Sequence, residues 1–387
     1  DVLTGFPFPS SGFAGSGVRL LRGSNVKRGV LVWDEDITKF WPSPTSHIRE
    51  YSLQAGDVVI AMDGALVGKS FAVIDTTDLP SLLVQRVARL RSRNADLRLI
   101  LSWIGSDHFV RYVDSVKTHT AIPHISPRDI RDFPCALPVT TSEQCAIADA
   151  LEDMEALLAQ LGALIDKKQN IKQAAMQQLL TGQTRLPGFH GNWERKRLDS
   201  VADIRSGGTP STSEPRFWDG EIPWCTPTDI TALNGHKYLG ETTRRITQLG
   251  LKASSAEMIP LHSVIMTSRA TIGECAINTV PVSTNQGFKN FVPFATTDVE
   301  FLYYLLSTQR QGFISLCGGS TFLEIGKVQL AAYEVRFPST KAEQTAIAAV
   351  LSDMDSEIAA LELRRENTRA LKQAMMQELL TGQTRLI

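Results

Sequence analysis

One stretch of this sequence occurs twice. Residues 142–186 read SEQCAIADALEDMEALLAQLGALIDKKQNIKQAAMQQLLTGQTRL, and residues 342–386 read AEQTAIAAVLSDMDSEIAALELRRENTRALKQAMMQELLTGQTRL. The two copies align without a gap at a constant offset, and roughly half of their positions are identical. A repeat at a long, fixed separation indicates that one structural plan has been used twice.

Each copy is predicted to form one long helix. Apolar residues recur at alternating spacings of four and three, the heptad pattern of helices that wind around each other. About 39 helical residues would make a rod of roughly 58 Å. Because both rods have the same pattern, the simplest way to bury the two apolar seams is against each other. The predicted seam residues are Ile147, Leu151, Met154, Leu158, Leu161, Ile165, Ile347, Leu351, Met354, Ile358 and Leu361.

The two predicted helices also have matching start and stop signals. Thr140 with Glu143 forms the capping-box pattern, and Thr340 with Glu343 repeats it. Each copy ends in a glycine suited to the left-handed residue that follows a helix, Gly182 and Gly382. The alternative is a pair of unrelated surface helices in a helical domain. The identical TGQTRL endings and the uninterrupted alignment argue against that alternative.

Length and composition set broad limits on the class of protein. With 387 residues, two or more domains are expected. A hydrophobic content of 43% and a charged content of 21% fit a soluble globular protein. The net charge of −1 gives no global attraction to nucleic acid, so DNA binding would depend on local basic patches. No apolar run of about 18 residues predicts a membrane span, and no signal peptide is apparent.

The five cysteines are scattered through the chain without a C-x-x-C pair. This spacing predicts neither a zinc site nor a redox pair, and it is typical of reduced thiols in a cytoplasmic protein. Two histidines, His119 and His124, lie five residues apart, which suits neither one face of a helix nor one face of a strand. We interpret them as loop histidines, and no metal or cofactor is predicted.

The repeat extends beyond the helices, so the predicted order is globular domain, rod, globular domain, rod. Residues 122–138 match 322–338 at the same offset, and shorter matches lie further upstream. Short β-rich runs predict strand pairs at Val58–Met62 with Ser70–Ile74 and at Val264–Thr267 with Cys275–Val280. Leu97–Val113 and Val299–Cys317 are predicted to be helical. The fold class is therefore α+β, with domain 1 at 1–139, spacer helix 1 at 140–186, domain 2 at 187–339 and spacer helix 2 at 340–387.

The first copy of the repeat starts late. Asp1 falls opposite Ala202 or Asp203 of the second copy, which is preceded by an entry segment from the first rod. Trp193 and Leu198 of that segment are expected to pack at the opening of domain 2. We therefore expect fifteen or more residues to precede Asp1.

The ordered motifs of this chain resemble the specificity subunit of type I restriction-modification enzymes. The motifs are GGTPS (207–211), IPWCTPTDI (222–230), VIMTSRATIG (264–273) and NQGFK (285–289), with the long helices ending in LLTG. Singly these motifs are weak, but their order and duplication are specific, and the resemblance covers almost the whole chain.

The resemblance implies two target recognition domains, each reading one half of a split, asymmetric DNA sequence. It implies that the two long helices pair antiparallel and set the gap between the halves. Two modification (methyltransferase) subunits would attach, restriction (translocating nuclease) subunits would join the larger complex, and this chain would contribute no catalytic residue. A prokaryotic cytoplasm would be its location.

The first domain departs from the family pattern. It has GFPFPSSGF (5–13) where the second has GGTPS, and Asp63-Gly64 where the second has Ser268-Arg269. Since recognition domains differ when they read different bases, this departure does not weigh against the family. It does prevent base contacts from being transferred from one domain to the other.

The sequence lacks the motifs of the two enzyme classes that act on DNA in such systems. The sequence contains no Asn/Asp-Pro-Pro-Tyr/Phe loop of an adenine methyltransferase and no acidic pair followed by Glu-x-Lys of a metal-dependent nuclease. Val67-Gly68-Lys69-Ser70 ends like a P-loop, but Asp63 occupies the position of the required first glycine. A predicted strand follows instead of the helix whose N-terminus would bind phosphate.

Basic and polar residues of both domains are the candidate DNA contacts. Lysine and arginine to phosphate position a protein on DNA, while arginine, asparagine and glutamine to base edges read its sequence. Taken singly, each is better explained as an ordinary solvated charge; taken together, they favour DNA. The candidates are Arg22, Asn25, Lys27, Arg28, Lys69, Arg86 and Arg89 in the first domain, and Thr228, Arg244, Arg245, Ser268, Arg269, Thr271, Lys289 and Lys327 in the second.

Two other classes of function stay open at the level of sequence. The chain could be a non-enzymatic scaffold whose rods hold partner proteins and whose globular ends bind protein. It could also be an enzyme with an unrecognised site. Steep salt dependence of duplex binding would favour DNA recognition over the scaffold, and methyltransferase activity of the isolated chain would favour the enzyme.

Overall fold

The computed structural model describes residues 1–317 and 323–386, so Phe322 of the repeat lies outside the described residues. The chain divides into two compact units. Unit 1 is Asp1–Gly162 with Leu363–Ile387, and unit 2 is Ala163–Glu362. Each unit therefore holds one globular domain, the first part of one long helix and the last part of the other.

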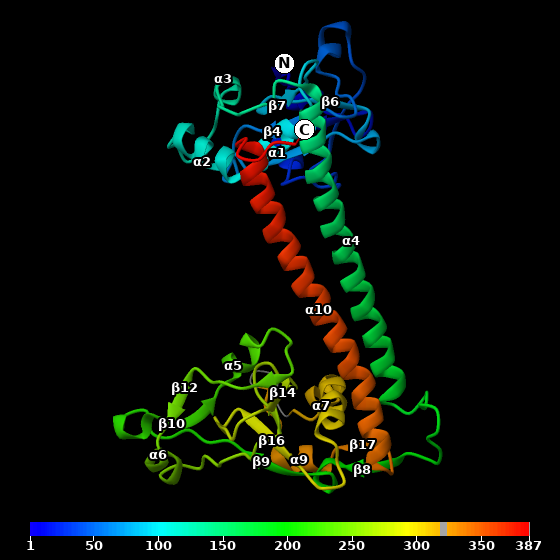
Figure 1. Ribbon diagram of the computed structural model, residues 1–387, viewed down its shortest axis with the longest axis vertical. Helices are drawn as coiled ribbons and strands as arrows, with labels where there is room; N and C mark the ends of the chain where they lie inside the picture. The colour runs from blue at the N-terminus through cyan, green and yellow to red at the C-terminus, as the bar shows by residue number, and fades with distance from the viewer. Residues whose placement is uncertain (318–322, 387) are drawn as a thin grey trace. The chain divides into compact units, whose positions relative to one another are not determined.

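Unit 1 is an α+β structure with two small sheets (Figure 1). The larger sheet has the strand order β1-β7-β4-β5 with antiparallel neighbours, and the smaller has the order β3-β2-β6. The strands are β1 (Val2–Thr4), β2 (Val18–Leu21), β3 (Lys39–Trp41), β4 (Val58–Ala61), β5 (Phe71–Val73), β6 (Ser81–Leu83) and β7 (Val87–Leu90). The helices are α1 (Leu97–Ile104), α2 (Asp107–Val116), α3 (Pro127–Arg131) and α4 (Thr141–Leu179), which begins here.

Unit 2 repeats this plan with one sheet more. Its sheets have the orders β11-β14-β13-β16-β9, β12-β10-β15 and β17-β8. The strands are β8 (Glu194–Arg197), β9 (Ala202–Ser206), β10 (Trp218–Cys225), β11 (Tyr238–Leu239), β12 (Arg244–Ile246), β13 (Val264–Thr267), β14 (Cys275–Asn278), β15 (Ser283–Thr284), β16 (Phe288–Pro293) and β17 (Glu334–Phe337). The helices are α5 (Pro227–Ala232), α6 (Gln248–Lys252), α7 (Val299–Thr308), α8 (Arg310–Ser315), α9 (Lys327–Ala332) and α10 (Lys341–Leu380).

The sheets of the two units correspond strand by strand. The run β1-β7-β4-β5 matches β9-β16-β13-β14, and β3-β2-β6 matches β12-β10-β15, with one parallel pair in each three-stranded sheet. The α+β prediction and both predicted strand pairs are confirmed. The alternation of short apolar runs with turns was sufficient to find these pairs, because each hairpin is local in sequence.

The two predicted domain helices each divide into two. Residues 97–113 contain all of α1, a break at Gly105 and the start of α2, because the Ser106 hydroxyl accepts a hydrogen bond from the Phe109 amide and begins a new helix. Residues 299–317 likewise contain α7 and α8, which meet at Gln309. The apolar pattern predicted the helical content but not these interruptions.

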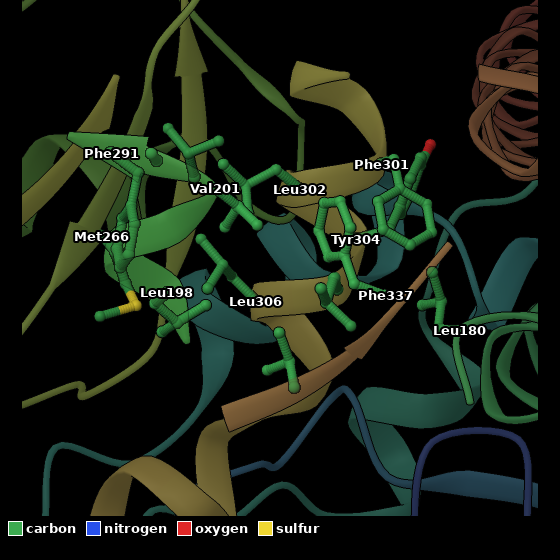
Figure 2. Close-up of a cluster of buried hydrophobic side chains, with 14 of the residues drawn as sticks. Leu180, Leu198, Val201, Met266, Phe291, Phe301, Leu302, Tyr304, Leu306 and Phe337 are labelled. Atoms are coloured by element: carbon green, nitrogen blue, oxygen red, sulfur yellow. The ribbon is translucent and has the colours of Figure 1, made fainter. Parts of the chain in front are cut away.

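The core of unit 2 joins the globular domain to both long helices (Figure 2). Phe291 of β16, Phe301 of α7 and Phe337 of β17 are buried in one cluster with Leu180, which follows the end of α4. Ile347 and Leu351 of α10 belong to the same cluster. In unit 1, Ile147 and Leu151 of α4 pack with residues of α1 and with the last turn of α10. The apolar seam is therefore part of the domain core in each unit.

Within each unit the long helices run antiparallel. In unit 1, Glu155 of α4 pairs with Lys372 of α10, and Glu143 pairs with Arg385 just beyond α10. In unit 2, Lys168 contacts Glu357 at 2.6 Å and Lys172 pairs with Asp355. As the residue number rises along α4 it falls along α10. Figure 1 shows both helices as unbroken rods of ribbon.

The first turns of the long helices are not complete capping boxes. Thr140 accepts a hydrogen bond from the Glu143 amide at 3.4 Å, as predicted. The Glu143 carboxylate, however, binds the Arg385 guanidinium with two hydrogen bonds instead of reaching back to the start of its helix. In unit 2, Glu343 does the same with Arg185. The TGQTRL endings therefore supply the cation that ties the end of one long helix to the start of the other.

Acid is expected to weaken this tie in unit 1. The hydrogen bonds from Arg385 hold the pKa of Glu143 below its ordinary value of 4.5. A carboxylate with a depressed folded pKa stabilises the protein fully above about pH 4.5, and this contribution is lost as the pH falls through the folded pKa. We expect the melting temperature of Glu143→Gln to be lower than that of the parent at pH 7, with the difference shrinking below pH 4.5. The exposed carboxylate Glu221→Gln is the control, and an equal loss at both pH values would contradict the prediction.

Candidate functional site

Four of the candidate cations in unit 1 are exposed and lie on adjoining loops. The Phe71 amide donates to the Lys27 carbonyl oxygen at 3.1 Å, which places Lys27 and Arg28 next to β5 and near Lys69 in the preceding turn. Arg86 approaches Asp63 at 3.6 Å, and its side chain is 61% exposed. These cations are free to meet a polyanion, because an exposed ion pair is held weakly.

Asn25 has a structural position. It is completely buried, its amide donates to the Val32 carbonyl at 2.9 Å, and its side-chain oxygen accepts from the Arg22 amide at 3.0 Å. Both side-chain groups of Asn25 are thus used to shape the loop between Arg22 and Val32. Arg22 itself is half-buried and lies beside this turn.

Arg89 is also internal. It lies on β7 with 5% of its surface exposed, and its guanidinium pairs with the Asp1 carboxylate at 2.7 Å. Burial lowers the pKa of Arg89, with a further lowering by the neighbouring Arg91. The Arg89–Asp1 pair joins β7 to the residue that precedes β1, and these two strands become neighbours only in the folded sheet. The sequence around Arg89 therefore did not show that its side chain is buried.

In unit 2, several candidates gather around Gly287. The Ser268 amide donates to the Gly287 carbonyl at 2.7 Å, and a side chain added at Gly287 would contact Pro227 at the start of α5. The exposed Thr228 follows Pro227, and Lys289 lies two residues beyond Gly287 on β16. Three loops that are far apart in sequence therefore meet at this glycine.

Arg269 and Lys289 form the charged part of this cluster. The Arg269 guanidinium donates to Glu324 at 2.8 Å, and both side chains are about two-fifths exposed (44% and 43%). Lys289 is only 5% exposed, and burial lowers its pKa. Glu324 raises this pKa to a smaller extent, while the cations Arg269 and Lys327 lower it further. A buried ammonium among like charges is costly to hold, and such sites are more common where a ligand is bound than elsewhere.

Polar atoms without a protein partner lie beside these charges. The hydroxyls of Ser268 and Thr271, which lie one residue before and two residues after Arg269, are buried and accept or donate no hydrogen bond among the described residues. An unsatisfied buried polar group costs about 1–3 kcal/mol. Their grouping with Arg269 and Lys289 shows a site rich in unused hydrogen-bonding capacity.

Arg244 lies on an aromatic pair. Its guanidinium is 3.7 Å from the centre of the Trp218 ring and 5.3 Å from that of Trp224, and the two rings meet edge to face. The neighbouring Arg245 is exposed and donates to the Glu221 carbonyl at 3.2 Å. The indole rings also donate to the carbonyls of Ser211 and Gly208, so they hold the GGTPS loop beneath Arg244.

The GGTPS loop requires its glycines because other backbone approaches it closely. A side-chain carbon at Gly207 would come within 1.9 Å of the Asn285 carbonyl oxygen, and one at Gly208 within 2.4 Å of the Ala256 nitrogen. This packing brings Thr209 to Gln286, and their side chains are hydrogen-bonded. Gln286, Thr209, Glu324 and the two tryptophans were not among the predicted site residues. Thr209 and Gln286 lie in the GGTPS and NQGFK motifs and Trp224 lies in IPWCTPTDI, so these motifs were the available signal, whereas Trp218 and Glu324 lie in none of them.

The turns that carry Asp63 and Arg269 are equivalent. Asp63 bridges His124 in unit 1 as Arg269 bridges Glu324 in unit 2, and Met62 and Ser268 donate to the equivalent carbonyls of Arg86 and Gly287. The sequence alignment paired Asp63 with Ser268, which is one residue out of step with the structure. In the structural alignment, the acid Asp63 of unit 1 is therefore the counterpart of the cation Arg269 of unit 2.

Among the described residues, no group of three or more His, Cys, Asp and Glu side chains could hold a metal ion. Within residues 1–317 and 323–386, no helix has the length and apolar character needed to cross a membrane.

Comparison with known proteins gives consistent results. The family model described as type I restriction modification DNA specificity domain matches residues 190–368. The chain is 37% identical over 169 residues to the type I restriction enzyme MjaIX specificity subunit of Methanocaldococcus jannaschii. It is 32% identical over 160 residues to the EcoAI specificity subunit of Escherichia coli. These alignments cover 43% and 40% of this chain but only 39% and 26% of the relatives' own lengths.

The fold is also similar to that of solved structures. The crystal structure of the HsdS subunit from Thermoanaerobacter tengcongensis aligns with a TM-score of 0.55 and 19% identity, over 95% of this chain and 91% of that one. The type I system S subunit from M. genitalium aligns with a TM-score of 0.55 and 13% identity, over 98% and 93% of the two chains. At this identity the likeness establishes the fold.

Proposed function

We propose that the chain is a specificity subunit of a type I restriction-modification system and that it selects the DNA sequence on which such a complex acts, because the matching family model and the relatives are all of that kind. Each globular domain would read one half of a split target. The observation that carries this proposal is the structural repeat itself: two domains of one plan present different side chains at equivalent turns. Two different readers predict a non-palindromic target.

The proposed reading surface of unit 2 is the cluster around Gly287. It combines Arg269 and Lys289 with the unused hydroxyls of Ser268 and Thr271. Arginine supplies the paired hydrogen-bond donors that distinguish guanine in the major groove. In unit 1, the equivalent turn offers Asp63, Arg86 and His124. The exposed cations Lys27, Arg28 and Lys69 would contact phosphates.

We propose that the chain itself does no chemistry and recruits methyltransferase and restriction subunits. Two exposed apolar residues on the long helices support the docking of partner subunits there. Ile171 of α4 and Leu371 of α10 occupy equivalent positions of the repeat and are 44% and 54% exposed. In unit 1, an apolar cavity of about 350 Å³ lies beside Leu371 and is lined also by Ala150, Met375 and Leu386. Two equivalent apolar positions are consistent with two copies of one partner.

Methylation mapping tests the function directly. The chain is expressed with its cognate methyltransferase in cells that lack other adenine methylation, and modified adenines are located by sequencing. The expected result is one split motif with a modified adenine in each half, absent when the chain is omitted. Methylation that is unchanged without the chain, or that follows a single continuous motif, would contradict the proposal. Duplex binding that is insensitive to salt would favour a protein scaffold.

Replacing Lys289 should make the protein more stable and weaken its binding to DNA. We expect Lys289→Met to raise the free energy of unfolding by about 1 kcal/mol, because it removes a buried charge that lies among cations. The same change should weaken binding to the half-site of unit 2. Urea denaturation and duplex titration measure the two effects. The matched variant Lys327→Met removes an exposed cation from the same cluster and should weaken binding without a gain in stability. Destabilisation by Lys289→Met would show that the ammonium has a structural role.

A further inference from the structure

One lysine of unit 2 is buried where the globular domain meets the long helices. Lys237 directly precedes β11, the edge strand of the five-stranded sheet, and its carbonyl accepts a hydrogen bond from the Ile277 amide at 2.8 Å. The Lys237 side chain is only 8% exposed. Burying an ammonium group is costly unless the group is paired and hydrogen-bonded. This position therefore requires partners for the charged end of the side chain.

The partners of the Lys237 ammonium group lie on two different helices. The ammonium group pairs with the Glu300 carboxylate of α7, and it donates to the Tyr304 hydroxyl of α7 at 3.2 Å and to the Ser352 hydroxyl of α10 at 2.9 Å. The rings of Tyr238 and Tyr304 are centred 5.0 Å from the same group. A lysine ammonium group has three N–H donors, so these partners use all of them.

The polar contacts continue from Tyr304 to the other long helix. The Tyr304 hydroxyl donates to the Asp355 carboxylate of α10, and Lys172 of α4 pairs with the same carboxylate. Burial raises the pKa of Tyr304, and the bond to Asp355 raises it further, so the hydroxyl stays protonated and can donate. Tyr304 also belongs to the apolar cluster that contains Phe301 (Figure 2). One continuous series of polar contacts therefore joins the edge of the sheet to α7, α10 and α4.

Unit 1 attaches its domain helix to a long helix by exposed ion pairs. Helix α1 corresponds to α7, because the residues that precede them, Asp96 and Asp298, each donate their amide to a glutamine of a long helix at 2.9 Å. The second residue of α1 is Arg98, a cation where α7 has an acid. Arg98 contacts Asp149 and Glu152 of α4 at 2.6 and 2.9 Å, but these acids are 61% and 59% exposed. Exposed pairs restrain geometry weakly, whereas the Lys237 contacts are buried.

We propose that Lys237 is a positioning residue: it fixes the orientation of the globular domain of unit 2 on the long helices and thereby limits which gaps between half-sites the chain accepts. The inference rests on the proposed function, in which this domain reads one half of a split target. A reader held by a buried, fully paired network is preorganised, so a duplex with the wrong gap meets it only at the cost of distortion. Lys237 contacts no DNA in this role. Loss of its ammonium group should therefore broaden the accepted gap without shifting the preferred gap or changing the bases that are read.

Lys237→Met tests this role, because methionine keeps an unbranched apolar side chain and removes the ammonium group. The full chain with its cognate methyltransferase is titrated with duplexes that carry the mapped target at its native gap, or at a gap changed by one base pair. We expect the preference for the native gap to fall by about tenfold, because hydrogen bonds to a charged group are among the stronger ones. Base preferences within both half-sites should stay as in the parent. Lys252→Met removes an exposed lysine at the end of α6 and is the matched control, which should keep the full preference for the native gap.

Two smaller changes keep the test decisive if Lys237→Met does not fold. Ser352→Ala and Tyr304→Phe each remove one hydroxyl from the network, and each should lower the preference for the native gap by about threefold. The positioning role is overturned if the folded variants keep the parent's gap preference, or if Lys237→Met alters the bases that are preferred in a half-site. A parent chain that prefers no half-site would instead contradict the proposed function on which the inference rests.

Discussion

Replacing Arg269 with alanine is expected to lower affinity for one half of the target by about 10- to 100-fold and to leave the other half unaffected. A well-placed arginine contact to a base contributes about 1–3 kcal/mol of discrimination. Arg269 is suited to such a contact because its guanidinium is partly exposed, is held by Glu324 at 2.8 Å and adjoins the unused hydroxyl of Ser268. Competition with duplexes altered in one half at a time measures the effect.

The repeat provides a matched variant for this experiment. Arg86→Ala removes a cation from the equivalent cluster of unit 1, where Arg86 lies 3.6 Å from Asp63, and should affect the opposite half of the target. Arg197→Ala removes a cation of unit 2 that pairs with Asp199 on the β8 side of the domain, so it controls for net charge. An equal loss for both halves with Arg269→Ala, or the same loss with Arg197→Ala, would exclude Arg269 as a reader of one half-site.

Glu324 provides a second check on the same contact. Glu324→Gln removes the charge that restrains Arg269 while keeping the shape of the side chain. We therefore expect binding to become stronger on unrelated duplexes and less selective for the target, because a freed guanidinium can pair with phosphates. Such a change would distinguish a restrained base contact from a simple phosphate contact.

The features predictable from sequence were those that depend on neighbours along the chain. The heptad spacing of Ile147 to Ile165 predicted a long helix with one buried face, and the turn signals predicted the hairpins of β4–β5 and β13–β14. These patterns need no knowledge of distant contacts. The identical TGQTRL endings showed that both halves share a plan, although not that Arg185 and Arg385 bind the distant Glu343 and Glu143.

The candidate site was less predictable because burial depends on strands that are distant in sequence. Asn25 and Arg89 have the residue types of DNA contacts. In the structure, however, the buried Asn25 side chain is hydrogen-bonded to Val32, and the buried Arg89 side chain is paired with Asp1. Conversely, Glu324 is acidic and was therefore not predicted to lie at a DNA-binding site, but a β-bridge between the two backbones brings it to Arg269. The equivalence of Asp63 and Arg269 could be recognised only in the structure. One of the two turns is a residue longer than the ungapped alignment assumes, and nothing in the sequence marks this difference.

Lengthening both long helices is expected to widen the gap between the half-sites without changing the half-sites themselves. Duplicating the heptads 155–161 in α4 and 355–361 in α10 keeps the apolar spacing of the seam. One added heptad lengthens a helix by roughly 10 Å, or about three base pairs of DNA. Three added heptads lengthen it by roughly 32 Å, close to one turn of the double helix.

The two insertions should differ in activity because DNA is helical. About three extra base pairs turn the second half-site around the duplex axis, so one heptad should give weak methylation at a gap wider by about three. Three heptads return the second half-site nearly to the original face, so strong methylation should reappear at a gap wider by about nine. A seven-residue insertion after Gly235, in a turn of unit 2, is the control and should leave the gap unchanged. Methylation mapping of each variant measures the gap, and an unchanged gap after three heptads would show that the long helices do not set the spacing.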